Sequence, residues 1–332
     1  MLQYRLKKKR YKKEYQKIEQ NSQSLTYIPL PKKYQNIPII NYYTKEYKNE
    51  KYMETMEDIT YIKKNFNNDQ NKHLFCLFDG HCGNESAKFS QEKFPKIFQE
   101  LLQKNPNNIE KALTESFLKL DELTQKNEDF LYMGNTATIV YIDKNILYCA
   151  NIGDSRCILI DYDKPIRLSY DHKCSDESEK KRIIKLGGNI RNNRLFGDIA
   201  ISRGIGDNEY KKYIISNPYI CKKNITYNEK YCIIGSDGLW DFVCDESVYN
   251  IAVNIDNGSE LVEKLVNVAV NVGSKDNISC IVISFREWEF FLLCFFIFFF
   301  FIIFLMMCKF WEFEIVFICV DLFLYLFFIV GF

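Results

Sequence analysis

Residues 74–83 read LFCLFDGHCG, an unbroken apolar run of strand length that ends in an aspartate, a glycine and a histidine. Such a run, closed by Asp-Gly, is typical of a buried β-strand that stops at a turn. Runs of similar length recur at 136–142, 146–152, 157–160, 231–235 and 279–285. The middle of the chain is therefore predicted to be a globular domain built on many short strands.

Helical patterns separate some of these runs but not others. Residues 110–126 and 259–272 carry apolar side chains at a spacing of three and four. The runs at 136–142, 146–152 and 157–160 instead follow one another directly, which favours antiparallel neighbours over a doubly wound parallel sheet. The expected fold class is an α/β (α+β) sandwich: two mainly antiparallel β-sheets flanked by helices.

Composition divides the 332-residue chain into three parts. Residues 1–50 are predicted to be a polar, Lys- and Tyr-rich N-terminal extension, and residues 51–286 the globular domain. Residues 287–332 form a Phe-rich hydrophobic tail, in which 290–308 lacks any charge and 315–332 is interrupted only by Asp321. Each segment is long enough to cross a bilayer. Two interpretations stay open: a membrane anchor with one or two transmembrane segments, or a gene-model artefact.

Charge and cysteine usage narrow the function classes. A net charge of +1 gives no indication of nucleic-acid binding. The twelve cysteines are scattered without a CxxC pair, and three histidines are too few for a histidine-rich zinc site. No signal-peptide core is found near the N-terminus. We therefore expect reduced thiols and a cytoplasmic protein; if the tail is an anchor, the domain faces the cytosol.

Four aspartates lie at the ends of strand-like runs: Asp79, Asp154, Asp237 and Asp276. Each alone is explained by a turn. Four at strand ends could converge on one edge, where clustered carboxylates are costly unless a cation neutralises them. Oxygen ligands suit Mg²⁺, Mn²⁺ or Ca²⁺, and no loop has EF-hand spacing. The residues by themselves predict an oxygen-ligated metal site.

Eight short motifs in order extend this interpretation. They are TMED at 55–58, FDGHCG at 78–83, GNTAT at 134–138, NIGDSR at 151–156, YDHK at 170–173, IAISRGIGD at 199–207, SDGLWD at 236–241 and GSKDNIS at 273–279. Together they resemble the metal-dependent protein phosphatases of type 2C (the PPM family) over about residues 52–285. Eight motifs in one order are far more specific than any one of them.

The resemblance implies two Mg²⁺ or Mn²⁺ ions per domain, with Asp79 bridging them. The expected metal residues are Glu57, Asp58, Asp79, Gly80 (through its carbonyl), Asp237 and Asp276. Asp58 would act by holding metal-bound water. Asp171 of YDHK resembles a ligand of a third, weaker ion, although capping of a following helix explains it nearly as well.

The resemblance also implies the reaction: direct hydrolysis of phosphoserine and phosphothreonine in proteins by a metal-bridging water, with His81 as general acid beside Asp79. The expected partners are phosphorylated protein substrates, and the catalytic domain is expected to be monomeric.

An alternative is a catalytically weak or silent scaffold that binds phosphoproteins. Met53 favours it, because the family often has a phosphate-binding arginine there and a thioether cannot replace a guanidinium.

Overall fold

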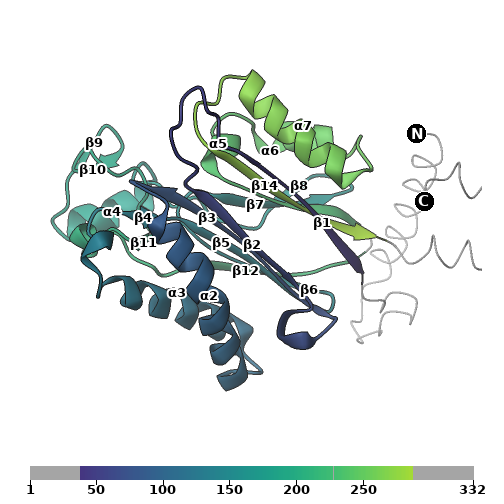
Figure 1. Ribbon diagram of the computed structural model, residues 1–332, viewed down its shortest axis with the longest axis horizontal. Helices are drawn as coiled ribbons and strands as arrows, with labels where there is room; N and C mark the ends of the chain where they lie inside the picture. Colours follow the sequence, from purple (N-terminus) through teal and green to yellow (C-terminus); the bar gives the residue numbers. More distant parts are fainter. Residues whose placement is uncertain (1–37, 227, 287–332) are drawn as a thin grey trace, which may run out of the picture. The chain divides into compact units, whose positions relative to one another are not determined.

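The structure is a computed structural model that describes residues 38–226 and 228–286 (Figure 1). Two main sheets pair their named strands antiparallel. The five-stranded sheet has the order β1 (Ile39–Tyr47), β14 (Ile278–Arg286), β13 (Glu229–Gly235), β7 (Arg156–Asp161) and β8 (Pro165–Arg167). The seven-stranded sheet has the order β11 (Ile205–Gly206), β4 (Gly134–Asn135), β3 (Lys72–His81), β5 (Ala137–Asp143), β6 (Ile146–Ile152) and β12 (Tyr219–Asn224), with β2 (Asp58–Lys64) on β3.

Helices cover the outer faces of both sheets (Figure 1). The seven-stranded sheet carries α2 (Glu85–Lys104) and α3 (Ile109–Thr124), and the five-stranded sheet carries α5 (Asp237–Trp240), α6 (Asp245–Ala252) and α7 (Gly258–Asn271). A smaller lobe holds α4 (Glu177–Lys185) and the hairpin of β9 (Ile190–Arg191) and β10 (Arg194–Leu195). Three 3₁₀ turns complete the described elements: η2 (Phe66–Asn68), η3 (Glu128–Phe130) and η4 (Asn208–Tyr210). The predicted sandwich is confirmed.

Strand β3 shows why its sequence is an unbroken apolar run. Leu74, Cys76 and Phe78 pack toward α2 and α3, in a cluster with Phe94. Phe75 and Leu77 point the other way, into the layer between the sheets. All five β3 side chains from Leu74 to Phe78 have no exposed surface. A strand buried on both faces gives no alternation, and it can end in polar residues only where it reaches an edge.

One predicted boundary is wrong. Residues 39–47 were expected in a polar extension, but they form β1 and pair with β14 from Ile39 opposite Arg286 to Tyr47 opposite Ile278. Ile40 is 4% exposed, and the ring of Tyr43 packs so closely on Gly258 that an added Cβ there would lie 2.3 Å from it. A strand at the edge of a sheet tolerates partly exposed Tyr, Thr and Lys, so this strand resembles an extension in composition.

The predicted membrane segments 290–308 and 315–332 lie outside the described residues, as do residues 1–37. Across the two described ranges, no helix combines the length and the apolar character that a bilayer crossing requires.

Replacing Ile40 by alanine tests whether β1 belongs to the folded domain. We expect Ile40→Ala to lower the free energy of unfolding by about 2–5 kcal/mol, the usual cost of truncating a buried Ile. Thr44→Ala, at an exposed position of the same strand, should change it by less than about 0.5 kcal/mol. Urea unfolding of both variants measures this. If both substitutions change the free energy of unfolding by the same small amount, residues 39–47 would be a solvated extension and not part of the folded domain.

Candidate active site

The ends of several strands bring three predicted carboxylates together at one edge of the sandwich. Asp58 begins β2 and lies directly opposite Asp79 on β3. The backbone N–H of Asp237, at the start of α5, lies 3.5 Å from Oδ2 of Asp79. Ser155 donates its hydroxyl to the same oxygen, at 3.2 Å. The residues thus converge because β2 begins at this edge, whereas β3 and β13 end there.

The surroundings of these three carboxyl groups raise their pKa values and so disfavour the charged forms. Burial raises the pKa of Asp58 to about 7, although the hydroxyls of Ser236 and Ser279 oppose the shift. Burial and then repulsion from Asp237 raise the pKa of Asp79 well above its usual range. Burial and then Asp154 and Asp276 do the same for Asp237. Burial, together with the neighbouring carboxyl groups, therefore makes ionisation costly unless a cation compensates the charge.

The arrangement fits divalent cations. Oδ2 of Asp58 is buried and has no hydrogen-bond partner among the described residues, which is costly unless a ligand or water meets it. Within the described part of the chain, no three Asp, Glu, His or Cys side chains close around one point as a ready-made cage. A hard cation held here by one or two carboxylates, the Gly80 carbonyl and water agrees with both observations.

Two asparagines, which the sequence analysis did not assign, tie the loop of Glu57 to the loop of Asp276. The side chain of Asn277 accepts a hydrogen bond from the Glu57 N–H at 2.7 Å and donates to the carbonyls of Lys48 and Thr55. Asn49 donates to the carbonyl of Asp276 at 3.1 Å. The Glu57 carboxylate in turn accepts the Gly83 N–H at 3.1 Å. Asn277 directly follows Asp276, so its place in the motif was the available signal.

His81 is paired with Asp207, a residue that the sequence analysis quoted in a motif but gave no role. Nε2 of His81 lies 2.8 and 3.0 Å from the two carboxylate oxygens of Asp207, which is fully buried. Burial alone would lower the pKa of His81, but the charge and hydrogen bonds of Asp207 outweigh it and raise the pKa above 6.5. The Asp207 carboxylate fits at this place because residue 134 is a glycine: a Cβ there would lie 2.2 Å from the carboxylate.

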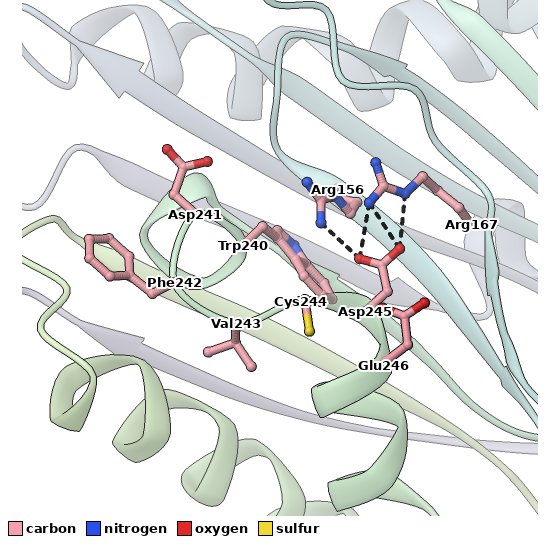
Figure 2. A pocket seen from close by; sticks show the side chains of 9 residues that line it. All are labelled: Arg156, Arg167, Trp240, Asp241, Phe242, Val243, Cys244, Asp245 and Glu246. Atoms are coloured by element: carbon pink, nitrogen blue, oxygen red, sulfur yellow. Dashed lines mark hydrogen bonds and ion pairs between the residues drawn. The ribbon is translucent and has the colours of Figure 1, made fainter.

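Asp171, the predicted residue of a third ion, lies in a network of arginine side chains. Its carboxylate accepts two hydrogen bonds from the guanidinium of Arg156, whose planar face lies 5.2 Å from the Trp240 ring centre. Asp245 binds Arg156 and Arg167 in the same network (Figure 2). These pairs already neutralise Asp171, which favours a structural role for it.

Near this arginine network, the negative charges of Asp154 and Asp241 contribute to the raised pKa of Asp237. Nζ of Lys173 lies between them, 3.3 Å from Asp154 and 2.7 Å from Asp241. The pocket drawn in Figure 2 is lined by Trp240 and its neighbours and shares with this acidic group only Asp241. The sequence analysis noted Asp154 and Asp241 but placed the extra ion at Asp171.

The structure shows the surroundings of Met53, which stands where the family often has a phosphate-binding arginine. Met53 is half-buried in the turn before β2. Two cations flank the neighbouring Tyr52: Nζ of Lys51 lies 5.0 Å and Nζ of Lys275 5.7 Å from the ring centre. Both lie on the same pair of loops as Glu57 and Asp276, so positive charge is present near the place where the arginine is absent.

Stability of the metal-free protein should depend on pH with a definite sign. The Asp58 carboxyl has a pKa near 3.8 when exposed and about 7 when folded, so between these values the folded state holds the extra proton. Stability is then expected to fall as the pH rises from about 4 to 7, by a few kcal/mol in total.

Melting temperatures in EDTA and in excess Mg²⁺ at pH 5 and pH 8 measure this. The gain from Mg²⁺ should be larger at pH 8, and Asp58→Asn should flatten the EDTA curve. An EDTA curve that stays flat or rises between pH 5 and 7 would contradict the cation site.

Comparison with known proteins agrees with this geometry. The family model for protein phosphatase 2C matches residues 44–278. Protein phosphatase 2C homolog 1 of Schizosaccharomyces pombe is 32% identical over 247 residues, covering 72% of this chain and 71% of the relative. The homolog 1 of Saccharomyces cerevisiae is 31% identical over 257 residues, covering 72% and 91%.

Among solved structures, a serine-threonine phosphatase 2C from Toxoplasma gondii superposes with a TM-score of 0.65 at 18% identity, covering 76% of this chain and 98% of that one, and so shares the fold. The chain belongs to the protein phosphatase 2C family.

Proposed function

We propose that this protein hydrolyses phosphoserine and phosphothreonine residues of other proteins with the aid of divalent cations. The observation that carries the proposal is the group of Asp58, which is buried, and Asp79 and Asp237, which are partly buried, at the same edge as the end of β3 that carries His81. Mutual repulsion makes the carboxylates a cation site, and the Asp207 carboxylate keeps His81 ready to give a proton.

The proposed cofactor is Mg²⁺ or Mn²⁺, with two ions per domain. Asp79 would be shared between them; Asp237 and Asp276 would serve one ion, and the Gly80 carbonyl and Glu57 the other. Asp58 would act through water. A third, weaker ion fits Asp154 and Asp241 beside Asp237 better than it fits Asp171. The chemistry that such ions supply is activation of water and neutralisation of phosphoryl charge.

The chain's own acid–base step is assigned to His81. A serine or threonine oxygen is a poor leaving group unless it is protonated as the P–O bond breaks. The Asp207 carboxylate raises the pKa of His81 and so favours the protonated imidazole, and two contacts from this one buried carboxylate fix the orientation of the ring. The proton then passes from the imidazolium to the leaving oxygen, while Asp207 stabilises the charged form of the ring beforehand.

The first test is phosphate release from a phosphothreonine peptide by the full chain, with Mn²⁺ or Mg²⁺ and with EDTA. We expect metal-dependent turnover that Asp79→Asn lowers more than about a hundredfold, because the carboxylate serves both ions. Asp256→Asn is the matched control, since the Asp256 side chain is 99% exposed.

If calorimetry shows that cations and phosphopeptide both bind but no phosphate is released, the result would contradict the proposed enzyme. It would support the catalytically silent scaffold that Met53 favours.

Asp207→Asn tests the histidine. Asparagine fits the left-handed backbone of position 207, where φ is +51°, and keeps the shape of the side chain. Without the carboxylate the pKa of His81 should fall, so the alkaline limb of the pH–rate profile should move to lower pH by about one unit.

Turnover of the phosphothreonine peptide should suffer more than that of p-nitrophenyl phosphate, whose leaving group needs no proton. Equal losses on both substrates, with an unmoved pH limb, would leave Asp207 with a structural role alone.

The remaining assignments rest on the sequence. Phosphorylated proteins are the proposed partners, the catalytic domain is proposed to act as a monomer, and nucleic acid has no part. Cytoplasmic location and anchoring by the tail stay predictions.

A further inference from the structure

We propose that four aromatic side chains beside the active site, Tyr132, Phe196, Tyr210 and Tyr213, form a docking surface for the substrate. Its occupant would be an aromatic or large aliphatic side chain a few residues from the phosphoserine or phosphothreonine of the substrate protein. We call these four residues the aromatic surface. The inference rests on the proposed function and adds to it a preference for substrate sequence.

The four rings touch one another although they come from three segments. Ring centres lie 6.2 Å apart for Tyr132 and Tyr210, 6.1 Å for Phe196 and Tyr210, and 5.4 Å for Phe196 and Tyr213. Tyr132 is nevertheless 53% exposed and Phe196 42% exposed. Scattered exposed apolar residues need no explanation, but adjoining exposed rings mark a surface that a partner covers.

The aromatic surface continues directly from the catalytic residues. Tyr210 is three residues from Asp207, and its N–H donates to the Asp207 carbonyl at 2.8 Å. Next to Tyr132, the Met133 carbonyl accepts the Asp207 N–H at 3.0 Å. The Met133 side chain also packs on Gly83, where an added Cβ would lie 2.8 Å from it. Since an extended chain advances about 3.3 Å per residue, a substrate bound at His81 reaches these rings within a few residues.

Phe196 is held outward at a conformational cost. Its φ is +53°, a left-handed backbone that bulky residues rarely adopt and that costs about 1–3 kcal/mol. The preceding turn uses two more left-handed residues, Asn192 and Asn193, and the Phe196 N–H is fixed on the Asn189 carbonyl at 2.7 Å. A ring that stays 42% exposed gains little burial in return. The strain is explained if the ring is displayed to bind another molecule.

Hydrogen bonds also fix the position of Tyr210 within the aromatic surface. The Tyr210 hydroxyl donates to the Asp198 carboxylate at 2.9 Å, which joins η4 to the segment after β10. Arg194 donates to the Asp198 carbonyl at 2.6 Å. Rings held in place before binding lose little entropy when a side chain packs on them, which makes them effective in recognition.

The experiment uses the full chain and phosphothreonine peptides of alanine and glycine, with one Phe placed in turn at each position from four before to four after the phosphothreonine. We expect one position, or two adjacent ones, to raise kcat/KM about tenfold over the peptide without Phe, the factor that partial burial of one ring gives. Phe196→Ala and Tyr132→Ala should each reduce that advantage at least about threefold, and the double variant should abolish it.

Two controls separate the outcomes. Turnover of p-nitrophenyl phosphate should stay unchanged in both variants, and Leu118→Ala, which truncates a side chain on α3 that is 40% exposed, should keep the full Phe advantage. Equal kcat/KM for all peptides, or an advantage that survives the double variant, would overturn the docking surface while the phosphatase stands. A change in oligomeric state of the variants, without a change in peptide preference, would assign the rings to a second copy instead. Absence of turnover on every substrate would overturn the proposed function itself.

Discussion

Repulsion among buried carboxylates is the constraint on which the catalytic edge depends. Asp58 and Asp79 are direct neighbours across two strands, and Asp237 reaches them from the start of α5. A fold that sought only stability would place amides or apolar groups there, because each buried charge costs several kcal/mol. The sheets, helices and asparagine-bound loops around this edge supply the stability that the carboxylates remove.

The surrounding contacts show how that edge is held together. Asn49 and Asn277 bind the turn after β1 to the loop before β14, so the segments carrying Glu57 and Asp276 cannot separate. Arg156 does the same on the other side, where it joins β7 to Asp171 and to the start of α6. In both places a buried polar side chain makes several hydrogen bonds at once, which fixes loops that have little apolar surface of their own.

Sequence reasoning identified the parts of the fold that have strong local signals. The apolar run of β3 and the antiparallel pair of β5 and β6 were predicted, because strands buried on both faces consist almost entirely of apolar residues. The expectation that β7 continues this pair was wrong, since β7 lies in the other sheet between β13 and β8. β1 was not predicted, since only some of its residues are covered and its exposed Tyr, Thr and Lys side chains resemble those of a solvated segment. The metal carboxylates are assigned from their motifs and stay predictions. Asp207 was missed because its role exists only when β4 pairs with both β3 and β11, which brings position 207 next to His81. The ion pair of Asp171 with Arg156 was not assigned because the two residues lie in separate motifs.

The pairing of β1 with β14 also determines where the described chain enters and leaves the domain relative to the catalytic loops. Tyr47 lies opposite Ile278 next to the catalytic loops, whereas Ile39 lies opposite Arg286 at the far end of the same two strands. Nine residues of strand span about 30 Å. The polypeptide therefore enters and leaves this domain at one place, a strand's length away from the reaction. A segment joined at residue 38 or at residue 286 therefore starts from the end of the domain opposite its catalytic loops.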